Sequence, residues 1–176
     1  NRIWLKRLNM GAIDPYRAIQ LCLSGPNLRA CGLHYDLRKY QPTLFYSDVD
    51  FDVPLGVNGD SYDRFMVRNE EIFQSLSIIS QVIDNLPIGS ISSFDQRQFD
   101  ELGFDKLTWS FYQLESPTGA LGISTYFKEG LIDRFRLRSP SFSSLHAISE
   151  ISRGCTKEDV FTMISTLNVV DSEADR

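Results

Sequence analysis

The sequence predicts an α+β fold made mainly of α-helices, with a small antiparallel sheet. Three observations lead to this prediction: a long stretch of helical spacing in mid-chain, three strand-like segments after it, and two shorter helical stretches near the end. The chain has 176 residues, of which 42% are hydrophobic and 23% charged, which is typical of a globular domain. No repeat or low-complexity linker divides it, so residues 1–176 are expected to form one unit.

The first elements are the least regular. Residues 24–59 follow neither the helical nor the strand period, and glycines and prolines recur through them. Long loops inside compact domains are usually functional or packed against a partner, so we expect one of these roles here.

A long helix follows, which Asp60 or Ser61 can cap. Its apolar side chains recur at steps of three, four and seven residues, which places them on one face: Phe65, Ile72, Leu76, Ile79, Ile83 and Leu86. Pro87 and Gly89 are expected to end it. At 1.5 Å per residue the helix would be about 40 Å long.

The sheet is predicted from three segments. Residues 109–114 and 121–127 form two strands joined by a turn at 116–119, which contains a Pro and a Gly. Residues 134–138 form the third, after a turn at 128–130. Its three arginines share one face, which either lies in solvent or pairs with acidic groups of a partner.

Two shorter helices complete the prediction. One follows Pro140 and carries apolar residues as far as Ile151, and Gly154 ends this region. Thr156 and Asp159 form the pattern of a capping box, which opens a helix that runs through Leu167. The remaining tail is polar.

Charge and composition exclude several classes of function. Residues 1–39 carry a net charge of +5 and residues 40–176 a net charge of −10. The pI near 5 and the lack of a basic stripe with interleaved aromatics disfavour nucleic acid as a partner. No apolar run approaches the roughly 20 residues of a membrane-spanning helix. Three cysteines without a Cys-x-x-Cys pair are expected to be buried thiols rather than disulfides or metal ligands.

The residues offer little catalytic chemistry. His34 and His146 have no activating partner nearby in the sequence, so both are expected to be structural. The acidic residues between 48 and 71 could suggest a divalent cation, but they lack the ligand spacing of a calcium loop. Arg64 and Arg68 are close enough in sequence to neutralise them, so internal ion pairs are favoured. We predict no catalytic residue and no metal ligand in this chain.

Several blocks along the chain occur in the order typical of one family. They are Asn1–Trp4, Ser24–Ala30, Gly32, Asp36–Lys39, Phe51–Gly56, Gly59–Arg64, Arg68, Glu70 and Glu71, Glu115–Pro117, Arg138–Pro140, Ser152–Gly154 and Glu173–Arg176. The sequence resembles the hydrogenase-like 49-kDa subunit of respiratory complex I, the proton-pumping NADH:quinone oxidoreductase, and its plastid relative. The resemblance covers essentially the whole chain but only the C-terminal part of that subunit. It implies the C-terminal half of a nickel-iron-hydrogenase large-subunit-like fold.

The resemblance also implies roles for the tail. Val170 would be a wall of the quinone-binding cavity beside the terminal iron-sulfur cluster, and Glu173, Asp175 and Arg176 would be a buried anchor. Asn168 stands where the family usually has Asp, which puts a proton-relay role for that position in doubt. Other departures are Asp171 for an aromatic residue, Ser172 for Gly and Thr118 for a common Lys.

A second set of residues is expected to be structural: Arg29, Asp36, Arg38, Asp60 and Arg64. By resemblance the chain binds no cofactor alone, ubiquinone binds at a shared site, and FMN and the iron-sulfur cluster belong to other subunits. The implied partners are a chain carrying the N-terminal part of the subunit, the small cluster-bearing subunit, other peripheral-arm subunits and the membrane subunit of the quinone site. The implied location is the matrix side of the mitochondrial inner membrane, with a plastid thylakoid or bacterial membrane as alternatives.

The missing N-terminal part suggests that residues 1–176 are one piece of a split subunit. A hydrophobic face would then be exposed in isolation, so the chain is expected to need partners to fold. Two other interpretations stay open. One is a fragment of a membrane-bound nickel-iron hydrogenase large subunit, although the chain lacks the paired Cys-x-x-Cys motifs of such enzymes. The other is a non-catalytic scaffold that kept the fold.

Overall fold

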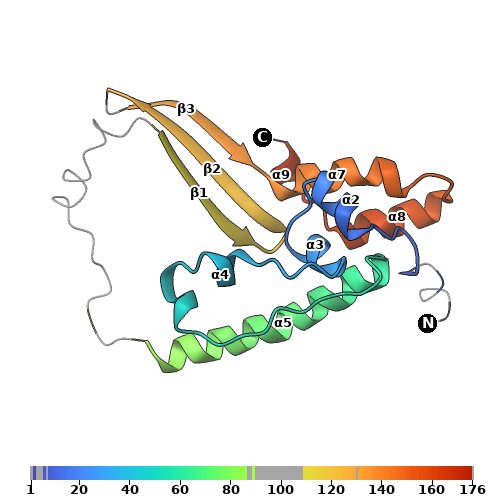
Figure 1. The fold of residues 1–176 in the computed structure, drawn as a ribbon, viewed down its shortest axis with the longest axis horizontal. Coiled ribbons are helices and arrows are strands. Elements are labelled where there is room, and N and C mark those ends of the chain that lie inside the picture. Colours follow the sequence, from blue (N-terminus) through green and yellow to red (C-terminus); the bar gives the residue numbers. More distant parts are fainter. Residues whose placement is uncertain are drawn as a thin grey trace.

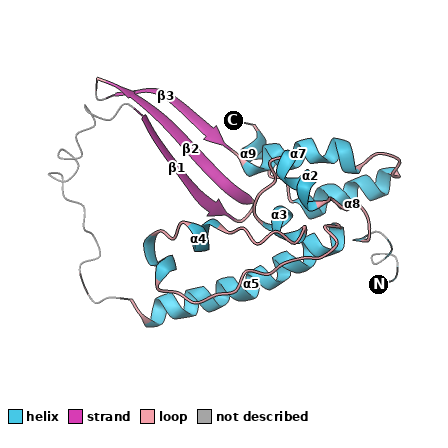
Figure 2. Ribbon diagram, in the orientation of Figure 1, coloured by secondary structure: helices cyan, strands magenta, loops and turns pink. Residues whose placement is uncertain are grey.

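A computed structural model describes residues 2, 6, 8–86, 89, 109–129 and 131–175. The elements, labelled as in Figure 1, are α2 (Pro15–Gln20), α3 (Pro26–Ala30), α4 (Leu37–Tyr40), the 3-10 helix η1 (Leu44–Ser47), α5 (Ser61–Asp84), β1 (Trp109–Ser116), β2 (Gly119–Lys128), β3 (Leu131–Arg138), α7 (Pro140–Ile151), α8 (Lys157–Leu167) and α9 (Asp171–Ala174). In Figure 2 the sheet extends away from the group formed by α2, α3, α7, α8 and α9, and α5 runs along the lower edge of the molecule. The predicted α+β class is confirmed.

The long helix is held at its start by the predicted cap. The Asp63 backbone N–H donates to Asp60 Oδ1 at 2.9 Å, so Asp60 is the N-cap and α5 begins at Ser61. The helix ends at Asp84, two residues before Leu86, and Pro87 lies outside the described residues. With 24 residues, α5 is about 36 Å long.

The sheet is antiparallel in the order β1-β2-β3, and each strand is longer than predicted. Ser116 pairs with Gly119, so the first turn contains only Pro117 and Thr118. The alternating sequence pattern marks only the central part of each strand. Hydrogen bonds to the neighbouring strand extend each strand beyond that part, which the sequence alone did not show. The predicted turn residue Gly130 lies outside the described residues.

The three arginines of β3 differ in how exposed they are. Arg134 and Arg136 are exposed, as a solvent-facing strand requires. Arg138, nearer the helices, donates to the carbonyl oxygens of Ala120 and Cys22. The last arginine therefore ties β3 to its neighbour strand and to the loop after α2.

Residues 24–59 contain more structure than predicted. They include α3, α4 and η1, and α2 precedes them without having been expected. Each of these helices has four to six residues, which is less than two turns, so no periodic pattern can form. The expectation that all three cysteines are buried was wrong, because Cys22 is exposed and only Cys31 is fully buried.

The core lies where α2, α3 and α7 meet. Its buried members are Ile13, Ala18, Leu21, Leu23, Leu28, Cys31 and Ala147, with Leu33 and Ile151 against them. The β1–β2 turn reaches this core through a close backbone approach. A Cβ at Gly25, whose φ is +63°, would lie 2.4 Å from Gly119 Cα, so a side chain there would push the turn away. This contact carries Thr118 to the tail described below.

The capping box of α8 gives a first prediction. Thr156 Oγ1 bonds Asp159 Oδ2 at 2.6 Å, and the Asp159 and Thr156 backbone amides complete the box. Thr156→Ala should cost about 1 kcal/mol and speed amide exchange in the first turn of α8 about fivefold, whereas Thr156→Ser should keep the original rate. Hydrogen exchange with mass spectrometry measures both, and equal rates in the two variants would contradict the capping role.

Candidate functional site

The C-terminal tail is fixed at its start by two side chains. Arg68 of α5 donates from Nη1 to the Thr166 carbonyl and from Nη2 to the Leu167 carbonyl, the latter at 3.0 Å. Asn27 of α3 donates to the same Leu167 carbonyl at 3.1 Å and accepts from Arg68. These bonds satisfy carbonyls that the end of α8 leaves open. The chain then turns at Asn168, whose φ of 53° and ψ of 52° are left-handed.

A second anchor holds the end of the tail. Thr118 Oγ1 in the β1–β2 turn donates to Glu173 at 2.9 Å, and Ser141 Oγ on α7 donates to the same carboxylate at 2.5 Å. Ser141 Oγ also accepts from the Val170 backbone N–H at 3.3 Å. Two hydroxyls from separate elements thus hold one carboxylate. Glu173 therefore ties the tail to the β1–β2 turn and to α7.

A network of buried charges lies beneath the tail, centred on Arg29 of α3. Its guanidinium contacts Glu71 on α5 at 2.6 Å, Glu115 on β1 at 2.8 Å and Asp36 at 3.5 Å. Arg38 on α4 contacts Asp36 at 2.6 Å. The side chains of Arg29, Asp36 and Glu115 are at most 4% exposed, so their charges are satisfied almost entirely by one another.

The network shifts the pKa values of its acids in opposite directions. Burial acts to raise the pKa of Asp36, but the hydrogen bond from Arg38 and the charges of Arg29 and Arg38 outweigh it and hold that pKa below its usual range. For Glu115, burial dominates and raises the pKa, with Arg29 opposing it. Arg38 and Arg29 therefore favour the charged form of Asp36, whereas burial disfavours the charged form of Glu115 and Arg29 offsets this only in part.

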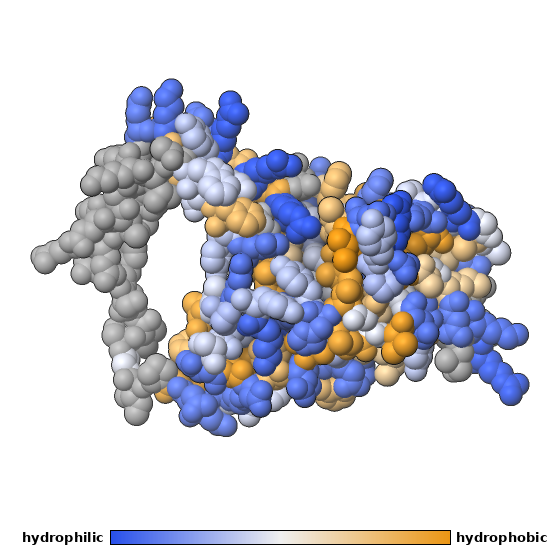
Figure 3. All heavy atoms as spheres, in the orientation of Figure 1, coloured by the Kyte–Doolittle hydropathy of each residue, from blue (hydrophilic) through white to orange (hydrophobic). Residues whose placement is uncertain are grey.

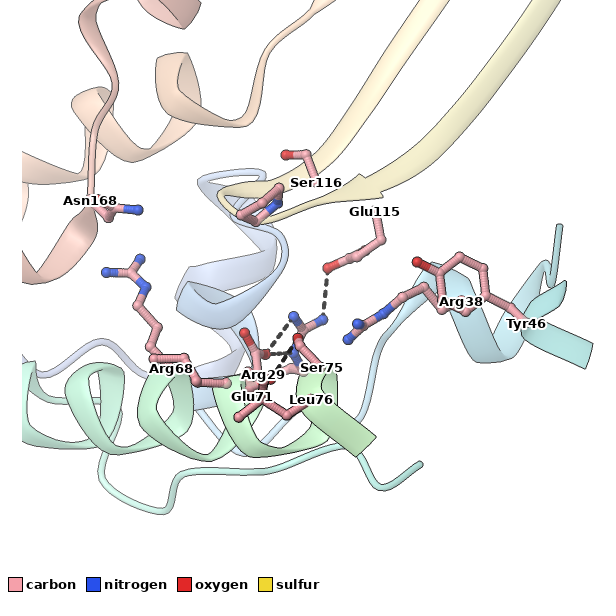
Figure 4. Close-up of a pocket in the computed structure, with 12 residues that line it drawn as sticks. Arg29, Arg38, Tyr46, Arg68, Glu71, Ser75, Leu76, Glu115, Ser116 and Asn168 are labelled. Carbon is pink, nitrogen blue, oxygen red and sulfur yellow. Dashed lines mark hydrogen bonds and ion pairs between the residues drawn. The ribbon is translucent and has the colours of Figure 1, made fainter. Parts of the chain in front are cut away.

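The network and the start of the tail border one cavity of about 530 Å³, and Figure 4 shows the residues that line it. Its polar lining includes Arg29, Arg38, Arg68, Glu71, Glu115 and Asn168. Arg68 projects from α5 toward Asn168, while Glu115 reaches down from β1 toward Arg29. The cavity is thus walled by groups from α3, α4, α5, β1 and the residue that follows α8.

The predicted structural residues separate into two places. Arg29, Asp36 and Arg38 meet in the network, as expected, whereas Asp60 caps α5. Arg64, which we expected to neutralise acids, instead donates to the carbonyls of Gly11 and Gly59 and to Ser61 Oγ, with the three distances between 2.9 and 3.0 Å. Burial lowers its pKa to about 10. This expectation was wrong because carbonyls left open around the start of α5 lie closer than any carboxylate.

The predicted tail residues are only partly brought together. Val170 and Glu173 are half-buried and share Ser141. Asn168 is exposed and lines the cavity. Asp175, predicted to be buried, is exposed after α9, because the last contacts that hold the tail are made at Glu173. Arg176 lies outside the described residues.

Sequence reasoning missed the roles of Arg68, Ser141 and Asn27. Their signal was present in part, since Arg68 and Asn27 fall in the family blocks, but their target is a backbone carbonyl that no pattern identifies. Among the residues described here, no group of three His, Cys, Asp or Glu side chains could hold a metal ion. None of the described helices combines the length and apolar character that crossing a membrane requires.

The fold and site define an α+β chain that presents an anchored tail and a polar cavity. Its sequence matches the family described as "Respiratory-chain NADH dehydrogenase, 49 Kd subunit" over residues 1–102 and 108–176. The chain belongs to this family of complex I 49-kDa subunits.

Curated relatives agree over the full chain, and each is a D-type subunit of NADH-quinone oxidoreductase from a bacterium. The chain is 37% identical to the relative from Chloroherpeton thalassium and 39% identical to that from Polynucleobacter asymbioticus, matching 45% and 48% of those proteins. It is 34% identical to the relative from Rickettsia felis, of which it covers 51%. All of this chain is matched in each case, so it spans about half the length of these relatives.

The Arg29 network gives a second prediction. Arg29→Met should remove about 3–5 kcal/mol from the free energy of unfolding, because it leaves Asp36 and Glu115 buried with one cation fewer. Arg17→Met is the matched control: it also removes one arginine, here from an exposed pair with Glu150 at 2.7 Å, and should change little. Urea unfolding of the chain, purified with its co-purifying subunits, measures both. Similar losses in the two variants would show that the network does not stabilise the fold.

Proposed function

We propose that this chain is a core component of the peripheral arm of a proton-pumping NADH:quinone oxidoreductase and helps form its quinone-binding cavity beside the terminal iron-sulfur cluster. The observation that carries the proposal is the match of the whole chain to one type of NADH-quinone oxidoreductase subunit from several bacteria. Because the chain spans about half of those proteins, it would share in quinone reduction without catalysing it alone.

The geometry of the tail supports a wall-forming role. Residues 168–173 leave α8 through a left-handed residue and are held at both ends, at Leu167 by Arg68 and Asn27 and at Glu173 by two hydroxyls. Val170 lies between these anchors and presents a β-branched apolar side chain with few rotamers. A segment fixed in this way can hold one side of a narrow apolar cavity in a constant shape, which quinone binding requires.

The chemistry of the described residues suits support more than reaction. The charges around Arg29 satisfy one another, and the hydroxyls of Thr118 and Ser141 beside the tail are already bonded to Glu173. In the proposal, FMN and the iron-sulfur clusters belong to other subunits, and ubiquinone binds at a site that this chain shares. Electron transfer would then occur outside this chain, while its tail limits where the quinone headgroup can lie.

The proposal includes partners and a place. The partners are the part of the subunit that this chain does not match, the small cluster-bearing subunit, other peripheral-arm subunits and the membrane subunit of the quinone site. The chain would be the C-terminal portion of a split subunit with a hydrogenase-like fold. We place it on the matrix side of the mitochondrial inner membrane, with a plastid thylakoid or a bacterial membrane as alternatives; the relatives named above are bacterial.

Substitution at Val170 tests the cavity assignment. In the purified complex, Val170→Trp should reduce NADH:ubiquinone activity at least tenfold, because the indole would fill space used by the quinone. NADH oxidation with ferricyanide, which accepts electrons without the quinone site, should be unchanged. Val170→Ala should raise the KM for quinone with less effect on kcat.

Val57→Trp serves as the control, since Val57 is 87% exposed on a loop before α5. It should leave both activities intact. If Val170→Trp also leaves quinone reduction unchanged, Val170 is not a wall of the cavity.

A further inference from the structure

The side of α5 that faces residues 44–52 carries glutamines together with the half-buried apolar residues Ile78 and Val82. Gln81 donates from Nε2 to the Asp50 carbonyl at 2.6 Å and accepts from the Asp50 backbone N–H at 2.9 Å. Gln74 accepts from the Asp52 backbone N–H at 3.0 Å. Residues 50–52 therefore pack along α5 through glutamine side chains, and Glu71 faces the Arg29 network on the same side.

The outer side of α5 carries a line of exposed apolar side chains. Ile72, Leu76, Ile79 and Ile83 follow one another at steps of four, three and four residues, so they form a single line, here called the α5 stripe. Each is between 54% and 62% exposed. A surface helix of a self-sufficient domain buries its apolar line and exposes its polar one. In Figure 3, apolar atoms are visible at the surface over α5.

The stripe has the dimensions and chemistry of a helix-packing face. It spans 11 residue steps, or about 17 Å at 1.5 Å per residue. Residues 72–83 contain no charged side chain. Branched apolar residues at helical spacing form a ridge that fits the groove of a second helix. The surface therefore suits an apolar helix face and provides no charge to recognise an ionic partner.

Hollows flank the stripe. Ile72 and Leu76 border the cavity of about 530 Å³ that contains the Arg29 network. Ile72 also borders a second hollow of about 310 Å³, which is lined by Arg68, Thr166 and Asn168. An element seated on the stripe would thus cover the start of the tail as well as α5.

The relatives indicate what fills this place. Those named above are about twice as long as this chain, and the whole chain matches them. We propose that the α5 stripe packs against an amphipathic helix from the portion of the subunit that lies outside the matched half. This inference rests on the proposed function and specifies the contact surface for one of its partners. It explains why the stripe is exposed in this chain, since the stripe would be interior once the two portions are joined.

Site-specific photo-cross-linking in the purified complex tests this contact. A benzoyl-phenylalanine placed at Ile72 or at Ile79 should cross-link to peptides that align with the unmatched half of the bacterial relatives, as identified by mass spectrometry. The control position is Glu70, which is exposed on the opposite side of α5, 200° around the helix from Ile72 at about 100° per residue. It should give at least fivefold less of that product.

Each other result overturns the inference. Products with a second copy of this chain, with residues of the same 1–176 segment, or with another component of the complex would assign the stripe to another occupant. Equal yields from Ile72 and Glu70 would show that the stripe is not a specific contact.

A charge variant gives a second readout. Leu76→Asp should lower the amount of the complementary portion that co-purifies with this chain at least tenfold, whereas Glu70→Gln should leave it unchanged. The outcomes also separate the two proposals. If the chain is absent from the oxidoreductase, the proposed function fails. If the chain is present and Leu76→Asp retains the complementary portion, only the contact assignment fails.

Discussion

The structure depends on one buried cation. Arg29 brings together carboxylates from three separate parts of the chain, Asp36 before α4, Glu71 on α5 and Glu115 on β1. A charged group with almost no exposure is tolerated only when its partners are all in place, so the four elements are stable together or not at all. Among the described residues, the apolar cluster around α2, α3 and α7 includes none from α4, α5 or β1, so the charge network provides a link to these elements that this cluster does not.

The position of the tail follows from that arrangement. With α5 fixed against α3, Arg68 and Asn27 reach the last carbonyls of α8, and with β1 fixed against α3, the β1–β2 turn places Thr118 beside Glu173. Two sets of hydrogen bonds from different elements, one at Leu167 and one at Glu173, therefore fix the position of residues 168–173. Under the proposed function, such a segment would contribute by holding its shape, and the reacting centres would lie on neighbouring chains.

The predictions from sequence succeeded where the determinants are local. Asp60 at the start of α5 and the Thr156–Asp159 box at the start of α8 are caps made within four residues, and the hairpin turn is formed by Pro117 and Thr118 with Gly119 directly after it. The short helices between 15 and 47 escaped prediction because they are held by tertiary contacts rather than by repeating patterns. Arg64 was assigned to the wrong partners for a related reason, since its carbonyl acceptors are 5 and 53 residues away in sequence.

The sequence by itself determined the α+β class, the main helices and strands, and the family, because periodicity, caps and ordered motif blocks are all properties of linear spacing. Only the tertiary structure decided which carboxylates surround Arg29, which side chains clamp the tail, and which side of α5 faces inward. These depend on residues from distant segments meeting in space. The apolar line of α5 would ordinarily predict a buried face, yet here it is exposed, because burial depends on all the surfaces present and not on one helix alone.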